Sequence, residues 1–400
     1  MEREDLCHTP AVHRHFTDWR GMKILIDATS ITKIKAGVGV YAKNLLDRLT
    51  RAPGTLQIVI LAQDDDAELD FSYHPNVTML WVPARLFRIL PLRVLLEQVY
   101  LPLVLLLRGI KVVHSLHYAL PLFCFGTRRV VTFHDMTFFT MPEVHRPFHL
   151  PYFKAFMRAS VRQADHIIFI SRSALKDCTA MLGRPHGSTS VIPHGKSEAF
   201  RPQSPGENLD RLREKYHLAE RFVLYIGTIE PRKNLPRLVE AFATVAAKDP
   251  AIQLVIAGKM GWMAEGLFAT IERLHLASRI VFTGFVAEED KPSLLSACTM
   301  FVYPSLYEGF GLPALEAIAC GAPTITSNTS SLPEVVGDAA LLIDPTDTEA
   351  LAAAMEKLLS SPDLREELKK KGPAQASQFT WERTAALTAD VYRSMQPDGN

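Results

Sequence analysis

Short apolar runs alternate with helix-length amphipathic stretches along most of the chain, and this alternation limits the fold more than any other feature. The runs FVLYI at 222–226 and QLVIA at 253–257 are mostly apolar and lack polar–apolar alternation, which is typical of parallel strands covered on both faces. Parallel neighbours need crossover connections, and the amphipathic stretches 235–248 and 291–297 can supply them. The remaining strands are expected at 23–27, 57–61, 77–82, 112–114, 130–134, 166–170, 280–283, 300–303, 324–326 and 340–343. The pattern predicts an α/β fold built on parallel sheets.

A polar stretch with two prolines and a glycine, EAFRPQSPGENLDRL, begins at Glu198 and divides the chain into halves of similar size. Such composition is expected of a linker. We therefore predict an N-terminal doubly wound domain over 22–197, a linker over 198–221, a second such domain over 222–372, and a C-terminal helix within 373–400 that crosses back to the first domain. Thr380 is the expected N-cap of that helix.

The first 21 residues are polar and contain no apolar core, so they do not read as a secretory signal. We expect a disordered leader or a start codon assigned too early, because MKILIDATS at Met22 reads as a natural beginning. The five cysteines show no C-x-x-C spacing, which predicts reduced thiols and a cytoplasmic location. A formal net charge of +1 gives no overall electrostatic basis for binding nucleic acid.

Apolar and basic residues coincide between positions 84 and 130, where seven Lys or Arg residues face Glu97 alone. Within the apolar stretch 86–107 the longest uncharged run, 98–107, has ten residues, whereas a membrane span needs about twenty, so we do not expect this stretch to cross a membrane. Two interpretations stay open. The segment is a buried helix with a solvated rim, or it docks on an anionic bilayer, which would place the protein on the inner face of the plasma membrane.

The segment 304–323 reads as a strand end, a glycine loop with Gly309 and Gly311, and a helix. The start of such a helix offers free N–H groups and the positive end of a dipole, which together favour anions. Glu308 lies in the loop and Glu316 is expected in the first helical turn. The alternative is that Glu316 merely complements the helix dipole while Glu308 is solvated.

Two further places carry polar groups at expected strand ends, and a third segment is a glycine loop. GTIEPRKN at 227–234 contains Arg232 and Lys233, which suit a diphosphate or form a solvated surface pair. His134, followed by Asp135, can hydrogen-bond a sugar hydroxyl or move a proton, or it caps the strand structurally. The loop with Gly37 and Gly39 formally matches a dinucleotide fingerprint but does not directly follow its strand, so NAD binding is disfavoured.

Taken together, these segments resemble the retaining nucleotide-sugar glycosyltransferases of family 4, whose GT-B fold has two Rossmann-like domains facing each other across a cleft. The resemblance covers about 22–392 and is carried by the E-x7-E element from Glu308 to Glu316. Supporting matches are GTIEPRKN, the glycine loop 37–39, HD at 134–135, ISRSALKD after Ile170, IPHG at 192–195, AGKMGW at 257–262 and SNTSSLPEV at 327–335. Thr228 stands where many relatives have arginine, so one phosphate contact of the family is absent.

The resemblance implies a role for each matched residue, with no metal or other cofactor. The catalytic residues would be Glu308, Lys233 and His134. The donor would be bound by Arg232, Lys233, Glu308, Gly309, Phe310, Gly311, Leu312 and Glu316, the last through the ribose hydroxyls. Gly37, Gly39 and Asp135 would border the diphosphate and the acceptor.

By the same resemblance, a hexosyl group, with mannose from GDP-mannose as first choice, would move with retention to a hydroxyl of a glycan or lipid-linked acceptor in cell-surface polysaccharide or glycolipid biosynthesis. A UDP-sugar-dependent glucosyl or galactosyl transferase is the alternative. A different enzyme on the same fold, an epimerase or hydrolase, stays open. From another class, a non-catalytic nucleotide-sugar-binding regulatory protein also stays open.

Overall fold

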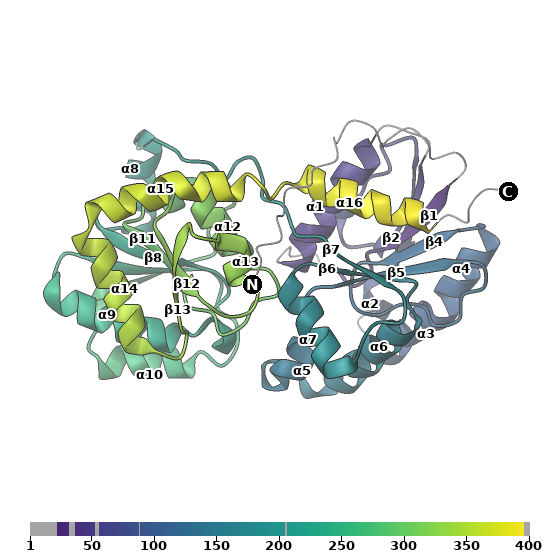
Figure 1. The fold of residues 1–400 in the computed structure, drawn as a ribbon, viewed down its shortest axis with the longest axis horizontal. Coiled ribbons are helices and arrows are strands. Elements are labelled where there is room, and N and C mark those ends of the chain that lie inside the picture. The colour runs from purple at the N-terminus through teal and green to yellow at the C-terminus, as the bar shows by residue number, and fades with distance from the viewer. Residues whose placement is uncertain (1–21, 32–36, 53–55, 88, 205, 396–400) are drawn as a thin grey trace, which may run out of the picture.

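Two parallel sheets, one in each half of the chain, form two domains joined by crossing segments (Figure 1). The computed structural model describes residues 22–31, 37–52, 56–87, 89–204 and 206–395. The expected leader over 1–21 therefore lies outside the described residues. The predicted fold class, two Rossmann-like doubly wound domains, is confirmed.

The first sheet has seven strands in the order β3-β2-β1-β4-β5-β6-β7, and the second has six in the order β10-β9-β8-β11-β12-β13. The strands are β1 Lys23–Asp27, β2 Gln57–Gln63, β3 Val77–Val82, β4 Val112–Ser115, β5 Arg128–Phe133, β6 His166–Phe169, β7 Ser188–Val191, β8 Phe222–Ile226, β9 Gln253–Ala257, β10 Ile280–Gly284, β11 Met300–Tyr303, β12 Thr324–Ser327 and β13 Ala340–Ile343. Each neighbouring pair is parallel, as in the register of Ile24 with both Ile58 and Val112.

Helices cover the sheets and make the crossovers between parallel strands (Figure 1). The α-helices are α1 Val38–Arg51, α2 Ala84–Phe87, α3 Leu90–Leu95, α4 Leu101–Leu107, α5 Thr137–Thr140, α6 Leu150–Gln163, α7 Arg172–Leu182, α8 Glu207–Tyr216, α9 Leu235–Lys248, α10 Glu265–Arg273, α11 Lys291–Ala297, α12 Leu312–Ala319, α13 Leu332–Val336, α14 Thr348–Ser360, α15 Pro362–Ala376 and α16 Trp381–Ser394. Single helical turns are η2 Ala67–Leu69, η3 Leu96–Tyr100 (π-helical), η4 Pro142–Val144, η5 Pro147–His149, η6 Pro231–Lys233 and η7 Ala277–Arg279.

Strand order reverses between β1 and β4 in the first sheet and between β8 and β11 in the second. Loops that leave the carboxyl ends of strands on either side of such a switch point diverge and leave a crevice, where doubly wound sheets bind ligands. In the second sheet these are the loops after Ile226 and after Tyr303. The two candidate donor segments of the sequence therefore meet at one crevice.

The sequence analysis did not predict strand β7, and the structure corrects the predicted linker. β7 has the polar sequence STSV and pairs only with β6, so this edge strand carries no apolar run. Within the expected linker, α8 folds, and Leu212 and Tyr216 join the core of the second domain. The predicted domain end at 372 falls inside α15, which continues to Ala376.

The last helix, α16, packs on the first domain beside α1, as Figure 1 shows. Thr380 caps it, accepting a hydrogen bond from the N–H of Arg383, as predicted. Trp381 and Tyr392 are buried in the core of the first domain. A parallel bridge joins Lys196 to Thr380, so the two segments that cross between the domains run side by side.

The stretch from Leu90 to Leu107 is continuously helical, running through α3, the π-helical turn η3 and α4. Pro102 has no N–H to donate to the carbonyl one turn earlier, which explains the irregular turn before it. With 18 residues, a mean hydropathy of 1.7 and 22% of the stretch buried, it is long and apolar enough to cross a membrane by length and composition alone. One helix of this kind is weak evidence for a span, so our expectation that the stretch does not cross a membrane stays a prediction.

Candidate active site

The loops after β8 and β11 are held together at the switch point of the second sheet. Asn234 adopts a left-handed φ of 61° between η6 and α9, and its side-chain amide donates to the carbonyls of Pro304 at 3.1 Å and Pro345 at 2.7 Å. The N–H of Leu306 donates to the carbonyl of Arg232 at 2.9 Å. These bonds fix Arg232 and Lys233 beside the glycine loop.

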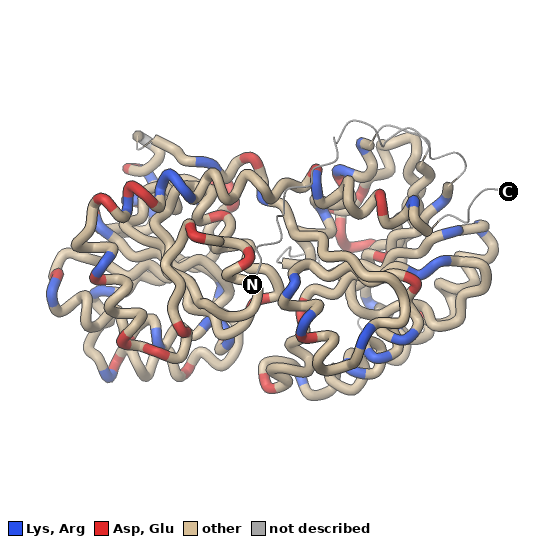
Figure 2. The backbone as a smooth tube through the Cα atoms, in the orientation of Figure 1, with Lys and Arg blue, Asp and Glu red and all other residues tan. Residues whose placement is uncertain are grey.

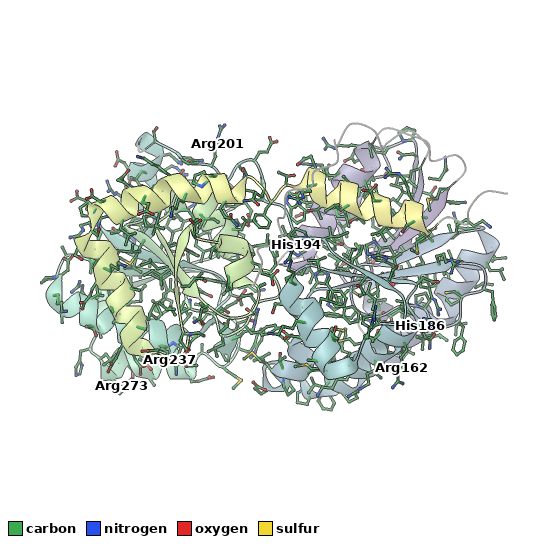
Figure 3. The ribbon with its side chains drawn as sticks, viewed as in Figure 1. Arg162, His186, His194, Arg201, Arg237 and Arg273 are labelled. Atoms are coloured by element: carbon green, nitrogen blue, oxygen red, sulfur yellow. The ribbon has the colours of Figure 1, made fainter. Side chains whose placement is uncertain are left out.

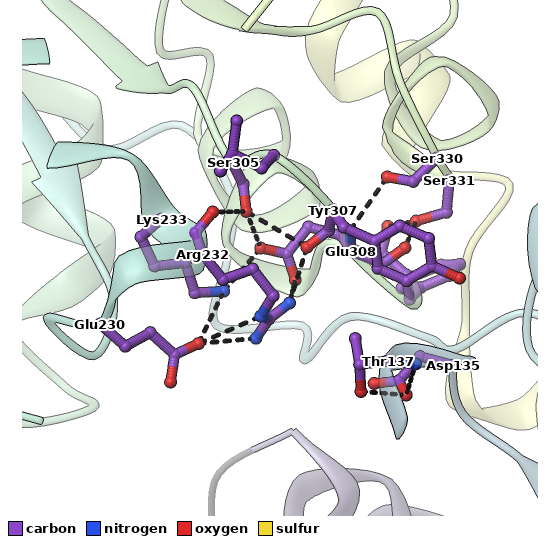
Figure 4. A network of polar contacts seen from close by, with 12 residues as sticks. Asp135, Thr137, Glu230, Arg232, Lys233, Ser305, Tyr307, Glu308, Ser330 and Ser331 are labelled. Carbon is purple, nitrogen blue, oxygen red and sulfur yellow. Dashed lines mark hydrogen bonds and ion pairs between the residues drawn. The ribbon is translucent and has the colours of Figure 1, made fainter. Parts of the chain in front are cut away.

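Glu308 is the centre of a buried polar network, drawn in Figure 4. Its carboxylate accepts hydrogen bonds from Lys233 Nζ at 2.5 Å and Arg232 Nη1 at 2.8 Å. It also accepts from the Tyr303 hydroxyl at 2.8 Å and the Ser305 hydroxyl at 2.7 Å. Glu308 is therefore not solvated, and Arg232 and Lys233 do not form a free surface pair.

Charges within this network balance. Arg232 also donates to Glu230 at 2.8 Å, so two carboxylates face two cations. Burial alone would raise the pKa of Glu308, but Arg232 and Lys233 outweigh it and lower that pKa to about 2. Burial and the neighbouring Arg232 lower the pKa of Lys233, with Glu308 opposing them. A diphosphate entering here would compete with Glu308 and Glu230 for the two cations.

The glycine loop 309–312 presents backbone N–H groups that have no acceptor within the described part of the chain. Two serines set its shape. The Ser331 hydroxyl lies 2.9 Å from the carbonyl oxygen of Glu308 and 2.8 Å from that of Phe310, and the N–H of Glu308 donates to Ser330 at 2.9 Å. These bonds fix the loop while its own N–H groups stay free to meet an anion, and α12 begins directly after Gly311.

Glu316 lies one turn further along α12 than we expected. It is the fifth residue of the helix, so it does not complement the dipole from the first turn. Burial raises its pKa to about 7, with Lys291 lowering it and Glu288 raising it further. It does not share the Glu308 network, and it is a carboxyl group that titrates near neutral pH.

From the first domain, His134 and Asp135 follow β5 directly and face this loop. Asp135 accepts hydrogen bonds from the hydroxyls of Tyr118 at 2.8 Å and Thr137 at 2.7 Å. His134 Nε2 lies 2.7 Å from the carbonyl oxygen of Leu116, so Nε2 must carry the proton and Nδ1 is an acceptor. Burial lowers the pKa of His134 to about 4, which keeps the ring neutral at pH 7.

The glycine loop of the first domain reaches the same place. Gly37 has φ 41° and caps α1, and Gly39 lies in the first turn of that helix. Residues 32–36, which connect the segment after β1 to this loop, lie outside the described residues. One turn on, the ring of Tyr41 contacts His134, with centroids 5.2 Å apart, and His194 at 4.8 Å. His194 sits at the domain junction in Figure 3 and also contacts the ring of Phe310 at 5.0 Å.

The two domains touch directly across the site. A methyl group at Gly309 would lie 2.1 Å from the carbonyl oxygen of His134. The Tyr307 hydroxyl donates to Asp177 at 2.7 Å. The Glu334 carboxylate of α13 accepts hydrogen bonds from the N–H groups of Arg172, at 2.8 Å, and Ser173, at 2.7 Å, at the start of α7. The structure is thus the closed arrangement of the domains.

The structure brings Arg232, Lys233, Glu308 and the 309–312 loop together and sets His134 and Asp135 against Gly309. Gly37 and Gly39 approach them through Tyr41 of α1, and Glu316 stands apart on α12. The fold also adds partners that the sequence analysis passed over. Glu230, Ser330 and Ser331 lie inside the segments GTIEPRKN and SNTSSLPEV, so their motifs offered a signal. Asp177 likewise ends the segment ISRSALKD, although only the folded chain shows that it meets Tyr307. Among the described residues, no group of three or more His, Cys, Asp or Glu side chains could hold a metal ion.

Comparisons with known proteins agree with this geometry. Residues 210–375 match the family model of glycosyl transferases group 1, and residues 36–197 match that of glycosyltransferase family 4. The chain is 38% identical over 268 residues to the O-antigen chain mannosyltransferase B of Escherichia coli, covering 66% of this chain and 70% of that protein.

A second relative and a solved structure extend the comparison. The serotype-specific mannosyltransferase WbdA of Escherichia coli is 35% identical over 238 residues, covering 58% of this chain but only 29% of WbdA. The structure of sucrose-phosphate synthase from Thermosynechococcus elongatus superposes with a TM-score of 0.74 at 24% identity, covering 94% of this chain and 99% of that one. That likeness concerns the fold.

Proposed function

The chain belongs to the group 1, family 4 glycosyltransferases of the GT-B fold, and we propose that it transfers mannose from GDP-mannose to a hydroxyl of a glycan or lipid-linked acceptor, with retention. Its similarity to two mannosyltransferases of Escherichia coli supports the sugar. That similarity equally supports a place in cell-surface polysaccharide biosynthesis. The four described cysteines are free thiols, which supports the cytoplasm as its compartment.

One observation carries the proposal: Glu308, bound to Lys233 and Arg232, lies in the loop whose Gly309 abuts His134 of the other domain. Cations and free N–H groups that suit a diphosphate are thus placed opposite groups that can meet a hydroxyl. A site that only stored a nucleotide sugar would not need the groups of the first domain that can meet an acceptor hydroxyl. This arrangement favours transfer between two substrates.

The chemical step follows from where charge develops. The bond from the sugar carbon to the diphosphate oxygen breaks with its electron pair on the diphosphate, while the acceptor oxygen bonds to the same carbon. The acceptor proton passes to the departing phosphate oxygen, so attack comes from the face of departure and configuration is retained. Arg232, Lys233 and the amides of 309–312 stabilise the growing negative charge. Such electrostatic stabilisation is usually the largest single contribution to catalysis. Glu308 contacts the transferring sugar.

His134 acts as a hydrogen-bond acceptor in this proposal. Its Nε2–H is bound to the Leu116 carbonyl, and its pKa of about 4 leaves Nδ1 unprotonated at neutral pH. It can therefore orient a sugar or acceptor hydroxyl, while general acid catalysis by this ring is unfavourable. Asp135 and the Gly37–Gly39 turn border the same space.

Thermal unfolding in EDTA with GDP, UDP, ADP and NAD in separate samples identifies the nucleobase of the sugar donor. A ligand at about one hundred times its Kd stabilises the folded state by about 2.7 kcal/mol, a shift of several degrees for domains of this size. We expect GDP to give the largest shift. A larger shift with UDP would favour a UDP-glucose or UDP-galactose donor, and a shift with NAD alone would overturn the proposal.

Turnover with a panel of nucleotide sugars separates the proposed transferase from its rivals. A non-catalytic regulatory protein would bind nucleotide and release no product with any acceptor. An epimerase or hydrolase would convert the donor rapidly without acceptor. We expect slow donor loss alone and faster loss when an acceptor is added.

Glu316 predicts a pH dependence of donor binding. If its ionised carboxylate accepts hydrogen bonds from the ribose hydroxyls, protonation below its pKa of about 7 removes that form. The KM for the intact nucleotide sugar is then expected to rise about tenfold from pH 8 to pH 6, because affinity follows the ionised fraction. Steady-state kinetics across this range measure it.

The matched variant is Glu316→Gln, which keeps the shape and removes the ionisation. We expect its KM to be high and flat over the same pH range, with kcat reduced much less than KM is raised. A wild-type KM that stays constant between pH 6 and 8 would contradict the ribose role of Glu316.

A further inference from the structure

One face of the 90–107 helical stretch is apolar and exposed to solvent. Leu95, Val99, Leu103 and Leu106 follow one another at intervals of four, four and three residues, which places them along one side of the helix. All four are more than half exposed, and Leu106 reaches 66%. Leu107, next along the chain, is 75% exposed. We call these five side chains the apolar stripe.

The opposite side of the stretch is firmly packed. Leu101 and Leu105 join the core between the stretch and strands β1, β2 and β4. The buried Glu97 pairs with Arg93 at 2.8 Å and accepts a hydrogen bond from the Tyr152 hydroxyl. Because this charged pair faces inward, Arg93 is not a surface cation. The stretch is therefore a fixed part of the first domain, and its outer face is unpartnered in the described chain.

A neighbouring loop adds two exposed phenylalanines. The Gln98 side chain donates to the carbonyl of Leu120 at 3.1 Å and accepts from the N–H of Leu122 at 2.9 Å. The same loop then presents Phe123 and Phe125, the latter 86% exposed. Cys124 between them packs against the core that lies under the stripe. The two rings are thus tied to the helix that carries the stripe.

Positive charge surrounds this surface. Arg85, Arg108 and Lys111 are exposed at the two ends of the helical stretch. Between positions 84 and 127 the sequence has no Asp or Glu other than Glu97, which is buried. Elsewhere, acidic and basic residues are interspersed over both domains (Figure 2). The exposed Asp64 lies beside Arg85, since its carboxylate accepts from the N–H of Ala84 at 3.0 Å. An apolar stripe with cations at both ends and no exposed carboxylate in its own segment complements an anionic lipid surface.

We propose that the apolar stripe, Phe123 and Phe125 dock the first domain on an anionic bilayer, with Arg85, Arg108 and Lys111 at the headgroups. Near its start, the stretch touches the cleft edge of the first sheet, where Arg93 donates to the Ser30 hydroxyl at 2.8 Å. It ends at Leu107, shortly before β4 begins at Val112 on the opposite edge of the sheet. Docking along this flank brings the cleft close to the lipid surface, and, insofar as the proposed function holds, to a lipid-linked acceptor.

The test is sedimentation of the full chain with vesicles of phosphatidylcholine alone or with about 30% phosphatidylglycerol, without nucleotide or acceptor. We expect binding to the anionic vesicles that weakens as salt is raised, since charges near the surface are screened. The variant Leu95→Gln/Leu103→Gln/Leu106→Gln should bind at least tenfold more weakly. The variant Arg85→Gln/Arg108→Gln/Lys111→Gln should lose about 100-fold, because each cation contributes several-fold at such a surface.

Matched controls lie on the second domain. Phe268→Gln/Leu342→Gln removes exposed apolar side chains there, and Arg201→Gln/Lys357→Gln/Lys370→Gln removes three exposed cations. Both controls should bind as the wild type does. Thermal unfolding of every variant checks the fold, and since the substituted side chains are exposed, melting temperatures should stay close together.

Three outcomes would overturn the proposal: no binding to anionic vesicles, equal loss in the second-domain controls, or a wild type that is dimeric in solution and becomes monomeric in the stripe variant without binding vesicles. The last would make the stripe a subunit interface. Vesicle binding is measured without donor or acceptor. Vesicle binding without any sugar transfer would therefore contradict the proposed function alone, and sugar transfer without vesicle binding would contradict this inference alone.

Discussion

Lys233→Ala is expected to lower turnover about 100- to 1000-fold, which corresponds to about 2.7–4 kcal/mol for removing one fixed donor that faces developing charge. Lys233 is buried, bonded to Glu308 at 2.5 Å and to the Tyr303 hydroxyl at 2.7 Å. In this state the cation is held by Glu308, so a diphosphate must draw it away. The loss should therefore appear in kcat and in the stabilisation by nucleotide.

Folding is the necessary check on that variant, since Lys233 belongs to a buried network. Glu308 keeps Arg232, Tyr303 and Ser305 as partners when Lys233 is lost, so the domain should still melt cooperatively. Lys233→Met retains most of the side-chain volume and should lose as much activity. Lys370→Ala, at an exposed position on α15, should leave turnover unchanged. Turnover of Lys233→Ala within about threefold of wild type would undermine the mechanism.

Apolar patterning was enough to predict the fold and the loops that form the site. Buried parallel strands need continuous apolar runs, so FVLYI and MFVY were found with their correct bounds at β8 and β11. Glycines and charges placed at the ends of those strands then located the crevice. Parallel topology guarantees that such loops gather at one edge, whatever their distance in sequence.

What the sequence could not supply was the partnership of each side chain. The sequence left Arg232 and Lys233 as diphosphate ligands or a solvated surface pair, because nothing in GTIEPRKN tells that Glu308, 75 residues away from Lys233, neutralises them. The edge strand β7 was not predicted because an exposed edge strand needs no apolar run, and its sequence STSV has none. Arg93 was counted among the seven basic residues between 84 and 130, and only the fold shows that it is paired with the buried Glu97, its i+4 neighbour. Long-range pairing and burial are properties of the assembled fold.

Gly309→Ala is expected to lower kcat/KM about 100-fold while both domains remain folded. The added methyl group would lie 2.1 Å from the His134 carbonyl oxygen, 3.0 Å from its carbon and 3.1 Å from Asp135 Cβ. Those atoms belong to backbone and to a short, hydrogen-bonded side chain, so they cannot move aside without shifting the domains. Gly309 itself has no left-handed φ, so alanine fits its own loop. A misplacement of about 1 Å between reacting groups costs on the order of 100-fold.

This prediction separates closure from donor binding, because the amide of residue 309 is retained and the cations of the second domain are untouched. We expect nucleotide to raise the melting temperature of Gly309→Ala as it does in the wild type, while the closed arrangement becomes less compact by small-angle scattering. Gly266→Ala is the matched control, since a methyl group there has nothing within 4 Å and alanine favours the helix α10. Full activity in Gly309→Ala would mean that transfer does not require the close contact between Gly309 and His134, and that the groups of the first domain act from a more open arrangement.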